Sequence, residues 1–170
     1  MLFRHGKSDA PSLQHADFDR GLTSRGVANA RRMGEFVRDH IKLPDIILVS
    51  TARRTSQTYE LAAEAWPDIP VVFSDKIYEA SASTLLLLVE EVAADYGSVM
   101  IIGHNPGLVV LLNLSVGSRH TDGNLSHFPS CSVADIGFEA PKLGDIEINE
   151  GRLLSIKRVR DLEASALAKK

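Results

Sequence analysis

The sequence has 170 residues, of which 44% are apolar and 24% are charged, a balance typical of a globular domain rather than a disordered or fibrous chain. Its 19 Lys and Arg against 22 Asp and Glu give a net charge of -3, which does not favour a nucleic-acid or anionic membrane partner. The single cysteine, Cys131, excludes an internal disulfide, and no apolar run approaches the ~20 residues that span a bilayer. We therefore expect one cytoplasmic domain over residues 1–170, with no nucleic acid and no membrane as partner.

Short apolar runs predict the strands of a parallel sheet. Residues 46–49 and 99–102 are continuous apolar runs, as expected for strands that are buried on both faces. Residues 71–73 form a shorter candidate, and residues 1–3 read as the last residues of a strand that is cut short. Helical patterns lie between these runs, so strands and helices alternate along the chain.

The first two predicted helices have recognisable ends. Thr23 is suited to cap the first helix, which should end near His40, before Pro44. The second helix is expected over about residues 52–65 and stops before Pro67, because proline has no amide hydrogen to continue it. The apolar stripe of the first helix has spacings of three and four: Val27, Ala30, Gly34, Val37 and Ile41.

Two more helices are predicted in the middle of the chain. The third covers about residues 83–96, with Gly97 as its C-terminal stop. The fourth begins with Asn105 as its cap and Pro106 in the first helical position, and it continues to Gly117.

The last part of the chain adds a loop and two strands. Residues 118–130 are polar and are predicted to form an irregular surface loop. Residues 132–138 and 152–160 are strand candidates that could pair antiparallel. The whole pattern predicts an α/β three-layer sandwich, with a mostly parallel central sheet, helices on both faces and an antiparallel C-terminal addition.

Cationic side chains follow three of the predicted strands. Arg4 and His5 follow the first strand, Arg54 lies just beyond the second, and His104 follows the run at residues 99–102. The carboxyl ends of parallel strands meet at one edge of a sheet, where ligands generally bind. Because helix N-termini and arginine side chains both suit phosphate oxygens, we expect a phosphate-sized cationic pocket at this edge.

In order along the chain, these segments resemble the motifs of the histidine phosphatase superfamily, and of its short bacterial SixA-type branch in particular. Residues 4–8 are similar to the Arg-His-Gly signature with the Lys-Ser extension of that branch. Residues 17–26 are similar to Asp-x-x-Arg-Pro-Leu-Thr-x-x-Gly and residues 50–58 to Ser-Pro-x-x-Arg-Ala-x-Gln-Thr, although Gly21 and Thr51 replace two prolines. The match covers nearly the whole chain, because it continues through residues 77–79, 103–106 and 128–130.

The resemblance implies catalytic roles for five side chains. His5 would be the nucleophile that attacks phosphorus, with its other ring nitrogen held as N–H by a backbone carbonyl. Arg4 and Arg54 would bind the phosphoryl oxygens and stabilise charge during transfer. His104 would donate a hydrogen bond to the same group, best as an imidazolium. Glu79 is the candidate proton donor, since it is a carboxylate in a segment aligned with the family.

The sequence gives weaker support for a functional role of several other polar residues. Ser8 and Arg20 are candidates for phosphate or substrate binding, but Ser8 could instead shape a turn and Arg20 could instead pair with Asp17. Three side chains are expected to be solvated at the surface: Arg53, His120 and His127.

Several other chemistries do not fit the sequence. Gly6-Lys7-Ser8 looks like the end of a nucleotide P-loop, but the first glycine of that motif would fall on Met1. Cys131 lacks an arginine at the spacing that cysteine phosphatases use, so we expect it to be a small buried apolar residue. The histidines show no paired metal-ligand spacing. We expect no metal and no other cofactor.

These observations favour a metal-independent phosphatase that works through a phosphohistidine intermediate on His5. The resemblance implies that its substrate is phosphohistidine on a signalling protein, with phosphate ion as the product. One alternative is an enzyme for small phosphorylated substrates, either a phosphoester phosphatase or a phosphoglycerate mutase-like enzyme. Another is a phosphoprotein-binding module that retains the pocket but catalyses no reaction.

Overall fold

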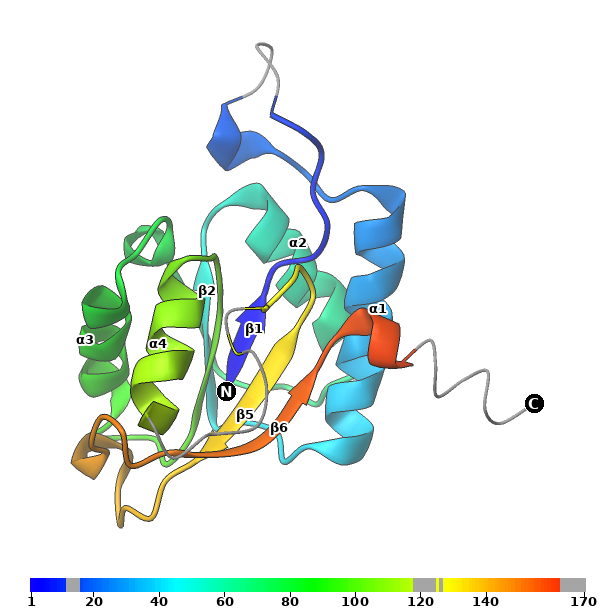
Figure 1. The fold of residues 1–170 in the computed structure, drawn as a ribbon. Coiled ribbons are helices and arrows are strands. Elements are labelled where there is room, and N and C mark those ends of the chain that lie inside the picture. The colour runs from blue at the N-terminus through cyan, green and yellow to red at the C-terminus, as the bar shows by residue number, and fades with distance from the viewer. Residues whose placement is uncertain (12–15, 118–124, 126, 163–170) are drawn as a thin grey trace.

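The computed structural model describes residues 1–11, 16–117, 125 and 127–162. Its centre is a six-stranded sheet with the strand order β3-β2-β4-β1-β5-β6 (Figure 1). The four strands from β3 to β1 pair in parallel, whereas β5 runs antiparallel to β1 and β6 antiparallel to β5. The strands are β1 (Leu2–Arg4), β2 (Ile46–Ser50), β3 (Val71–Ser74), β4 (Val99–Gly103), β5 (Val133–Gly137) and β6 (Arg152–Lys157). The predicted sheet, with its antiparallel C-terminal addition, is confirmed.

Helices cover both faces of this sheet (Figure 1). On one face lie α1 (Ser24–His40) and α2 (Arg53–Ala63), and on the other lie α3 (Ala82–Val92) and α4 (Gly107–Val116). Short 3-10 helices are Asp17–Asp19 (η1), Asp75–Ile77 (η2) and Leu143–Asp145 (η4). Among the described residues, no helix is both long and apolar enough to cross a lipid bilayer.

Alternate residues of the central strands pack into two separate cores. Ile47 and Val49 of β2 join the core that contains Val37 of α1, whereas Ile46 and Leu48 join the core of α3 and α4. Successive side chains of a strand point to opposite faces, so a continuous apolar run requires cover on both sides. The three-layer arrangement follows from this pattern.

The ends of α1 agree with the prediction, but its buried stripe differs in part. The Thr23 side chain accepts a hydrogen bond from the backbone N–H of Gly26 at 3.0 Å, and the helix ends at His40. Val27 and Ile41, expected in the stripe, are only half-buried. The residues that α1 buries are Gly26, Ala30, Met33, Gly34 and Val37.

The third predicted helix is shorter than expected. It ends at Val92 rather than near Tyr96, because Ala93 N–H donates to Glu90 and Asp95 N–H to Val92, the tighter bonds of a fraying helix end. The fourth helix lacks its expected cap. The Asn105 side-chain amide donates to the Phe128 carbonyl at 2.9 Å instead, and the helix starts at Gly107.

The loop predicted over residues 118–130 falls largely outside the described residues, and so does His120. Within it, His127 is exposed, as expected, whereas Phe128 is fully buried. Arg53 lies at the surface and Cys131 is buried, both as predicted.

The topology opens a crevice at the carboxyl edge of the sheet. β1 and β4 are neighbours, but the helices that follow them, α1 and α4, cover opposite faces. Such a divergence is where α/β sheets bind ligands. Two glycines allow close approach here: a Cβ on Gly26 would lie 2.1 Å from the Lys7 carbonyl oxygen, and one on Gly107 would lie 2.2 Å from that of Ala80.

Candidate active site

A cavity of about 640 Å³ lies at this edge of the sheet. It brings together all seven side chains that the sequence singles out: Arg4, His5, Ser8, Arg20, Arg54, Glu79 and His104. The remaining lining residues are Lys7, Asp9, Ala10, Pro11, Asp17, Thr23, Asn105 and Ser130.

His5 is held firmly at the end of β1. Its backbone N–H donates to Gly103 of β4 at 3.1 Å, and its carbonyl accepts from the N–H of Cys131 at 2.9 Å. The ring atom Nδ1 lies 2.7 Å from the carbonyl oxygen of Gly6, while the Gly6 N–H donates to Thr58 of α2 at 2.9 Å. With Nδ1–H donated to Gly6, the lone pair of the neutral ring is on Nε2.

The surroundings of His5 keep its ring neutral. Burial lowers the pKa of His5 to about 3, although the bond to Gly6 opposes the shift. The nearby charges of Arg54 and Arg4, and the neighbouring His104, lower this pKa further. At neutral pH the Nε2 lone pair is therefore available to an electrophile.

The two predicted phosphate-binding arginines flank the cavity. Arg4 donates through Nη1 to the carbonyl oxygen of Phe128 at 2.9 Å, and Arg54 is only 4% exposed. Burial, followed by the charge of Arg54, lowers the pKa of Arg4, but an arginine with an ordinary value of 12.5 stays cationic at neutral pH. In the described part of the chain, the Nε atoms of both guanidinium groups are buried without a hydrogen-bond partner.

His104 lies beside His5, with 5.2 Å between the ring centroids. Its Nε2 atom is 2.8 Å from Ser50 Oγ, and its buried Nδ1 has no hydrogen-bond partner among the residues described. Burial, followed by the charge of Arg54, lowers the pKa of His104 to about 4. In the free protein the His104 ring is therefore neutral at neutral pH, and its expected role as an imidazolium toward a bound phosphoryl group stays a prediction.

Ser8, Arg20 and Glu79 lie at the outer part of the pocket. Arg20 donates to Ser8 Oγ at 3.1 Å and through Nη2 to Asp17 at 2.6 Å, so it lines the pocket and also pairs with Asp17. Glu79 is exposed, and its backbone has a φ of 52°, in the left-handed region that non-glycine residues seldom adopt. Backbone strain of this kind is frequent at functional sites.

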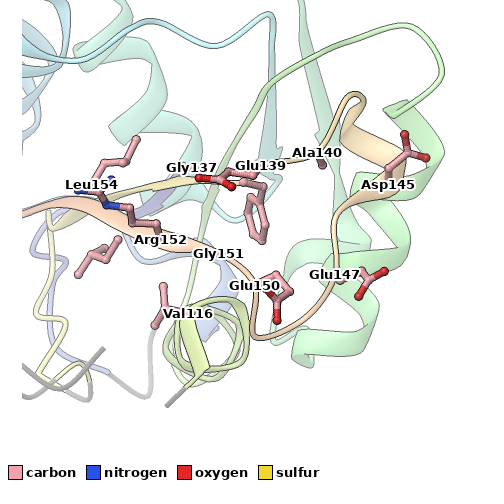
Figure 2. A pocket seen from close by; sticks show the side chains of 12 residues that line it. Val116, Gly137, Glu139, Ala140, Asp145, Glu147, Glu150, Gly151, Arg152 and Leu154 are labelled. Atoms are coloured by element: carbon pink, nitrogen blue, oxygen red, sulfur yellow. The ribbon is translucent and has the colours of Figure 1, made fainter. Parts of the chain in front are cut away.

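A larger cavity of about 730 Å³ lies at the opposite edge of the sheet, between the end of β5 and the start of β6. Figure 2 shows the carboxylates of Glu139, Asp145, Glu147 and Glu150 around it, with Arg152 nearby. Acidic side chains repel a phosphoryl group, so this cavity does not compete with the cationic pocket as a phosphate site. Within the described residues, no three His, Cys, Asp or Glu side chains are grouped to hold a metal ion.

Comparison with known proteins gives the family of this chain. Residues 1–98 match the profile of the histidine phosphatase superfamily (branch 1). The chain belongs to this superfamily. The crystal structure of a protein assigned as the phosphohistidine phosphatase SixA of Agrobacterium tumefaciens is 30% identical, with a TM-score of 0.77. The match covers 92% of this chain and 95% of that one, which places this histidine phosphatase in the SixA-type branch.

Sequence relatives of this histidine phosphatase include proteins that match over most of their length and mutases that match over a part of it. An uncharacterized protein of Mycobacterium tuberculosis is 29% identical over 136 residues, which cover 77% of this chain and 84% of the relative. A 2,3-bisphosphoglycerate-dependent phosphoglycerate mutase of Mycobacterium leprae is 41% identical over 83 residues. That match covers 46% of this chain and only 34% of the mutase, so the likeness to mutases is confined to part of their length.

Two polar residues of this histidine phosphatase have contacts that sequence reasoning missed. The sequence predicts Asp17 only as a partner of Arg20, but Asp17 also contacts Arg54 at 3.0 Å and accepts a hydrogen bond from Tyr78 at 2.8 Å. Ser50 belongs to the family-like segment 50–58 but has no predicted role of its own, and the structure places its Oγ 2.8 Å from His104 Nε2. Both lie in family-like segments, which was the only available signal, because their partners are 37 and 54 residues away.

Proposed function

We propose that this histidine phosphatase hydrolyses phosphohistidine on a phosphorylated protein, through a covalent intermediate on its own His5 and without a metal ion. The observation that carries the proposal is the neutral ring of His5 in one pocket with the cations of Arg4 and Arg54. A neutral imidazole beside fixed cations is what nucleophilic attack on a negatively charged phosphoryl group requires.

The reaction uses His5 twice. The lone pair of Nε2 attacks phosphorus while Nδ1–H remains bonded to the Gly6 carbonyl. The bond from phosphorus to the substrate imidazole breaks, its electron pair returns to that nitrogen, and the nitrogen takes up a proton from solvent. Water then attacks phosphorus and releases a proton to solvent, the bond to Nε2 breaks with its electron pair on Nε2, and inorganic phosphate leaves with His5 regenerated. Arg4 and Arg54 balance the phosphoryl charge throughout, which is the task that a metal ion has in other phosphatases.

The rim of the pocket supports a protein substrate. Residues 9–11 border the cavity and are exposed, as is the Glu79 side chain. A small metabolite is usually enclosed by its site, whereas a histidine presented on a protein surface needs an accessible rim. The leaving group supports the same substrate, because a protonated imidazole departs more easily than an alkoxide and needs less help from an acid.

Trapping of the phosphoenzyme tests the mechanism. The protein is mixed with a phosphohistidine-bearing donor protein and quenched within milliseconds. We expect an acid-labile, base-stable phosphate on His5 that is absent in His5→Ala, and EDTA should leave the rate unchanged. His127→Ala, a substitution of an exposed histidine, is the matched control and should label normally. A fully active His5→Ala variant, or EDTA inhibition reversed by a divalent ion, would contradict the proposal.

A phosphoglycerate mutase-like activity is the second candidate, and the sequence match to mutases favours it. In a mutase the phosphoryl group on His5 returns to a sugar-acid acceptor instead of to water. Incubation of the labelled enzyme with a phosphoglycerate distinguishes the two: release of inorganic phosphate supports the phosphatase, whereas a phosphorylated product supports the mutase.

A further inference from the structure

The contact between Ser50 and His104 joins two buried polar side chains. Ser50, at the end of β2, is fully buried, and His104, just after β4, is 7% exposed. Their side chains are 2.8 Å apart, from Ser50 Oγ to His104 Nε2. Ser50 Oγ also accepts the backbone N–H of Ala52 at 3.4 Å. A buried hydroxyl has one hydrogen to donate, and that hydrogen needs an acceptor among its neighbours.

The hydroxyl proton of Ser50 needs an acceptor. The N–H of Ala52 is a donor, so it uses one of the two lone pairs of Ser50 Oγ and gives the hydroxyl hydrogen no acceptor. If His104 donated to the second lone pair, this buried hydroxyl hydrogen would have no partner within the described chain. Within the described residues, His104 Nε2, 2.8 Å away, is the side-chain atom in position to accept it. A neutral imidazole carries one N–H, so an Nε2 that accepts from Ser50 leaves the ring proton on Nδ1.

Nδ1 is the other nitrogen of the His104 ring, and His104 lines the pocket. It is buried, has no partner within the described chain, and belongs to a ring whose centroid is 5.2 Å from that of His5. With a proton, Nδ1 donates a hydrogen bond to a phosphoryl oxygen. In the other tautomer its lone pair faces that oxygen and repels it. Which tautomer forms therefore decides whether a neutral His104 helps or opposes phosphoryl binding.

We infer that Ser50 is a positioning residue that holds neutral His104 in the Nδ1–H tautomer, so that the ring donates to the phosphoryl group without first being protonated. The inference deepens the proposed function and rests on it for the identity of the ligand. Ser50 itself does not touch the reacting atoms, because it acts through the opposite nitrogen of the His104 ring.

The tautomer is measurable in the free protein, without substrate. Long-range ¹H–¹⁵N spectra at pH 7 distinguish a protonated ring nitrogen from an unprotonated one, and loss of a signal set in His104→Gln assigns the ring among the six histidines of the chain. We expect the Nδ1–H form in the wild-type protein and a shift toward Nε2–H in Ser50→Ala. An Nε2–H tautomer in the wild-type protein overturns the inference. Because that first readout uses the unmodified chain, it decides the question even where Ser50→Ala fails to fold.

Binding and turnover provide the second readout. Ser50→Ala should weaken the binding of inorganic phosphate and lower kcat by about tenfold, the usual effect of losing one oriented hydrogen bond. Ser115→Ala, which removes a buried serine hydroxyl from α4 away from the pocket, is the matched control and should change neither. Unchanged phosphate binding in a folded Ser50→Ala overturns the inference. A protein that hydrolyses no phosphohistidine but shows the expected tautomer and phosphate affinities contradicts the proposed function and supports the role of Ser50.

Discussion

The carboxylate of Asp17 lies against the guanidinium of Arg54, with Oδ2 3.0 Å from Nη2, while the Asp17 carbonyl oxygen is 2.6 Å from Nη1. Arg20 and Tyr78 also donate to this carboxylate. Burial opposes its ionisation, but the bonds from Tyr78 and Arg20 and the charge of Arg54 outweigh burial and lower the pKa of Asp17 to about 2. The ionised carboxylate of Asp17 is thus paired with Arg54, one of the two arginines proposed to bind phosphate.

Asp17→Asn should tighten the binding of inorganic phosphate. The substitution removes a charge that repels the anion and competes for Arg54, and at an effective dielectric typical of a protein surface we expect about a fivefold lower Kd, or ~1 kcal/mol. Titration calorimetry at moderate ionic strength measures it. Asp19→Asn makes the same charge change on the exposed side of the same short helix and should have little effect. Weaker phosphate binding in Asp17→Asn would show that the carboxylate organises Arg54 rather than competing with the ligand.

Arg54→Ala and His104→Ala should each lower kcat/KM by at least ~100-fold. Loss of a donor to the transition state costs about 3 kcal/mol, a much larger effect than loss of a surface charge. Arg53→Ala is the matched control, because Arg53 is the exposed neighbour of Arg54 on the same helix turn. Thermal unfolding of each variant separates catalysis from folding. Loss of Arg54 removes its repulsion with Arg4 but also its bonds to Asp17, so the two effects on stability partly offset one another. A variant that simply unfolds would identify its residue as structural.

The sequence was sufficient for the sheet and for the place of the site. Continuous apolar runs such as residues 46–49 have few alternatives to a strand covered on both faces, and the polar residues that follow them must meet at one edge. Predictions from neighbouring residues were wrong where a residue distant in the sequence binds the same side chain. Asn105 has the chemistry of a helix cap, but its amide binds the Phe128 carbonyl 23 residues away. The neutral state of His104 was equally hidden, because it depends on burial that only the assembled fold creates.

The two buried histidines should make the protein less stable as the pH falls. In the unfolded chain each ring binds a proton near its ordinary pKa of 6.5, whereas in the folded protein the pKa of His5 is about 3 and that of His104 about 4. Below pH 6.5 the unfolded state therefore binds more protons, and the free energy of unfolding falls by up to roughly 1.4 kcal/mol per pH unit for each histidine.

Thermal unfolding between pH 7.5 and pH 4.5 measures this effect. The Tm should decrease steadily below pH 6.5, and His104→Gln should show a shallower decrease because one of the two groups is gone. The stabilising contacts of Asp17 do not contribute in this window, since they are lost only as the pH falls from 3.8 toward 2. His40→Gln, at an exposed position on α1, should keep the wild-type slope. An equal slope in His104→Gln would mean that folding does not lower the pKa of His104.

Glu79→Gln should harm phosphoester hydrolysis more than phosphohistidine hydrolysis. An alkoxide leaving group needs a proton from the enzyme, and Glu79 is the carboxylate proposed to supply it, whereas an imidazole nitrogen has a far higher affinity for a solvent proton. We expect wild-type kcat/KM to fall in the order phosphohistidine, aryl phosphate, alkyl phosphate, with the Glu79→Gln loss increasing in that order. Glu60→Gln, which changes an exposed glutamate on α2, is the control and should leave all three rates unchanged.

Equal losses of kcat/KM for every substrate in Glu79→Gln would mean that Glu79 supports the shape of the pocket and does not protonate the leaving group. A small sugar phosphate cleaved faster than a phosphohistidine protein would favour a metabolite phosphatase or mutase instead.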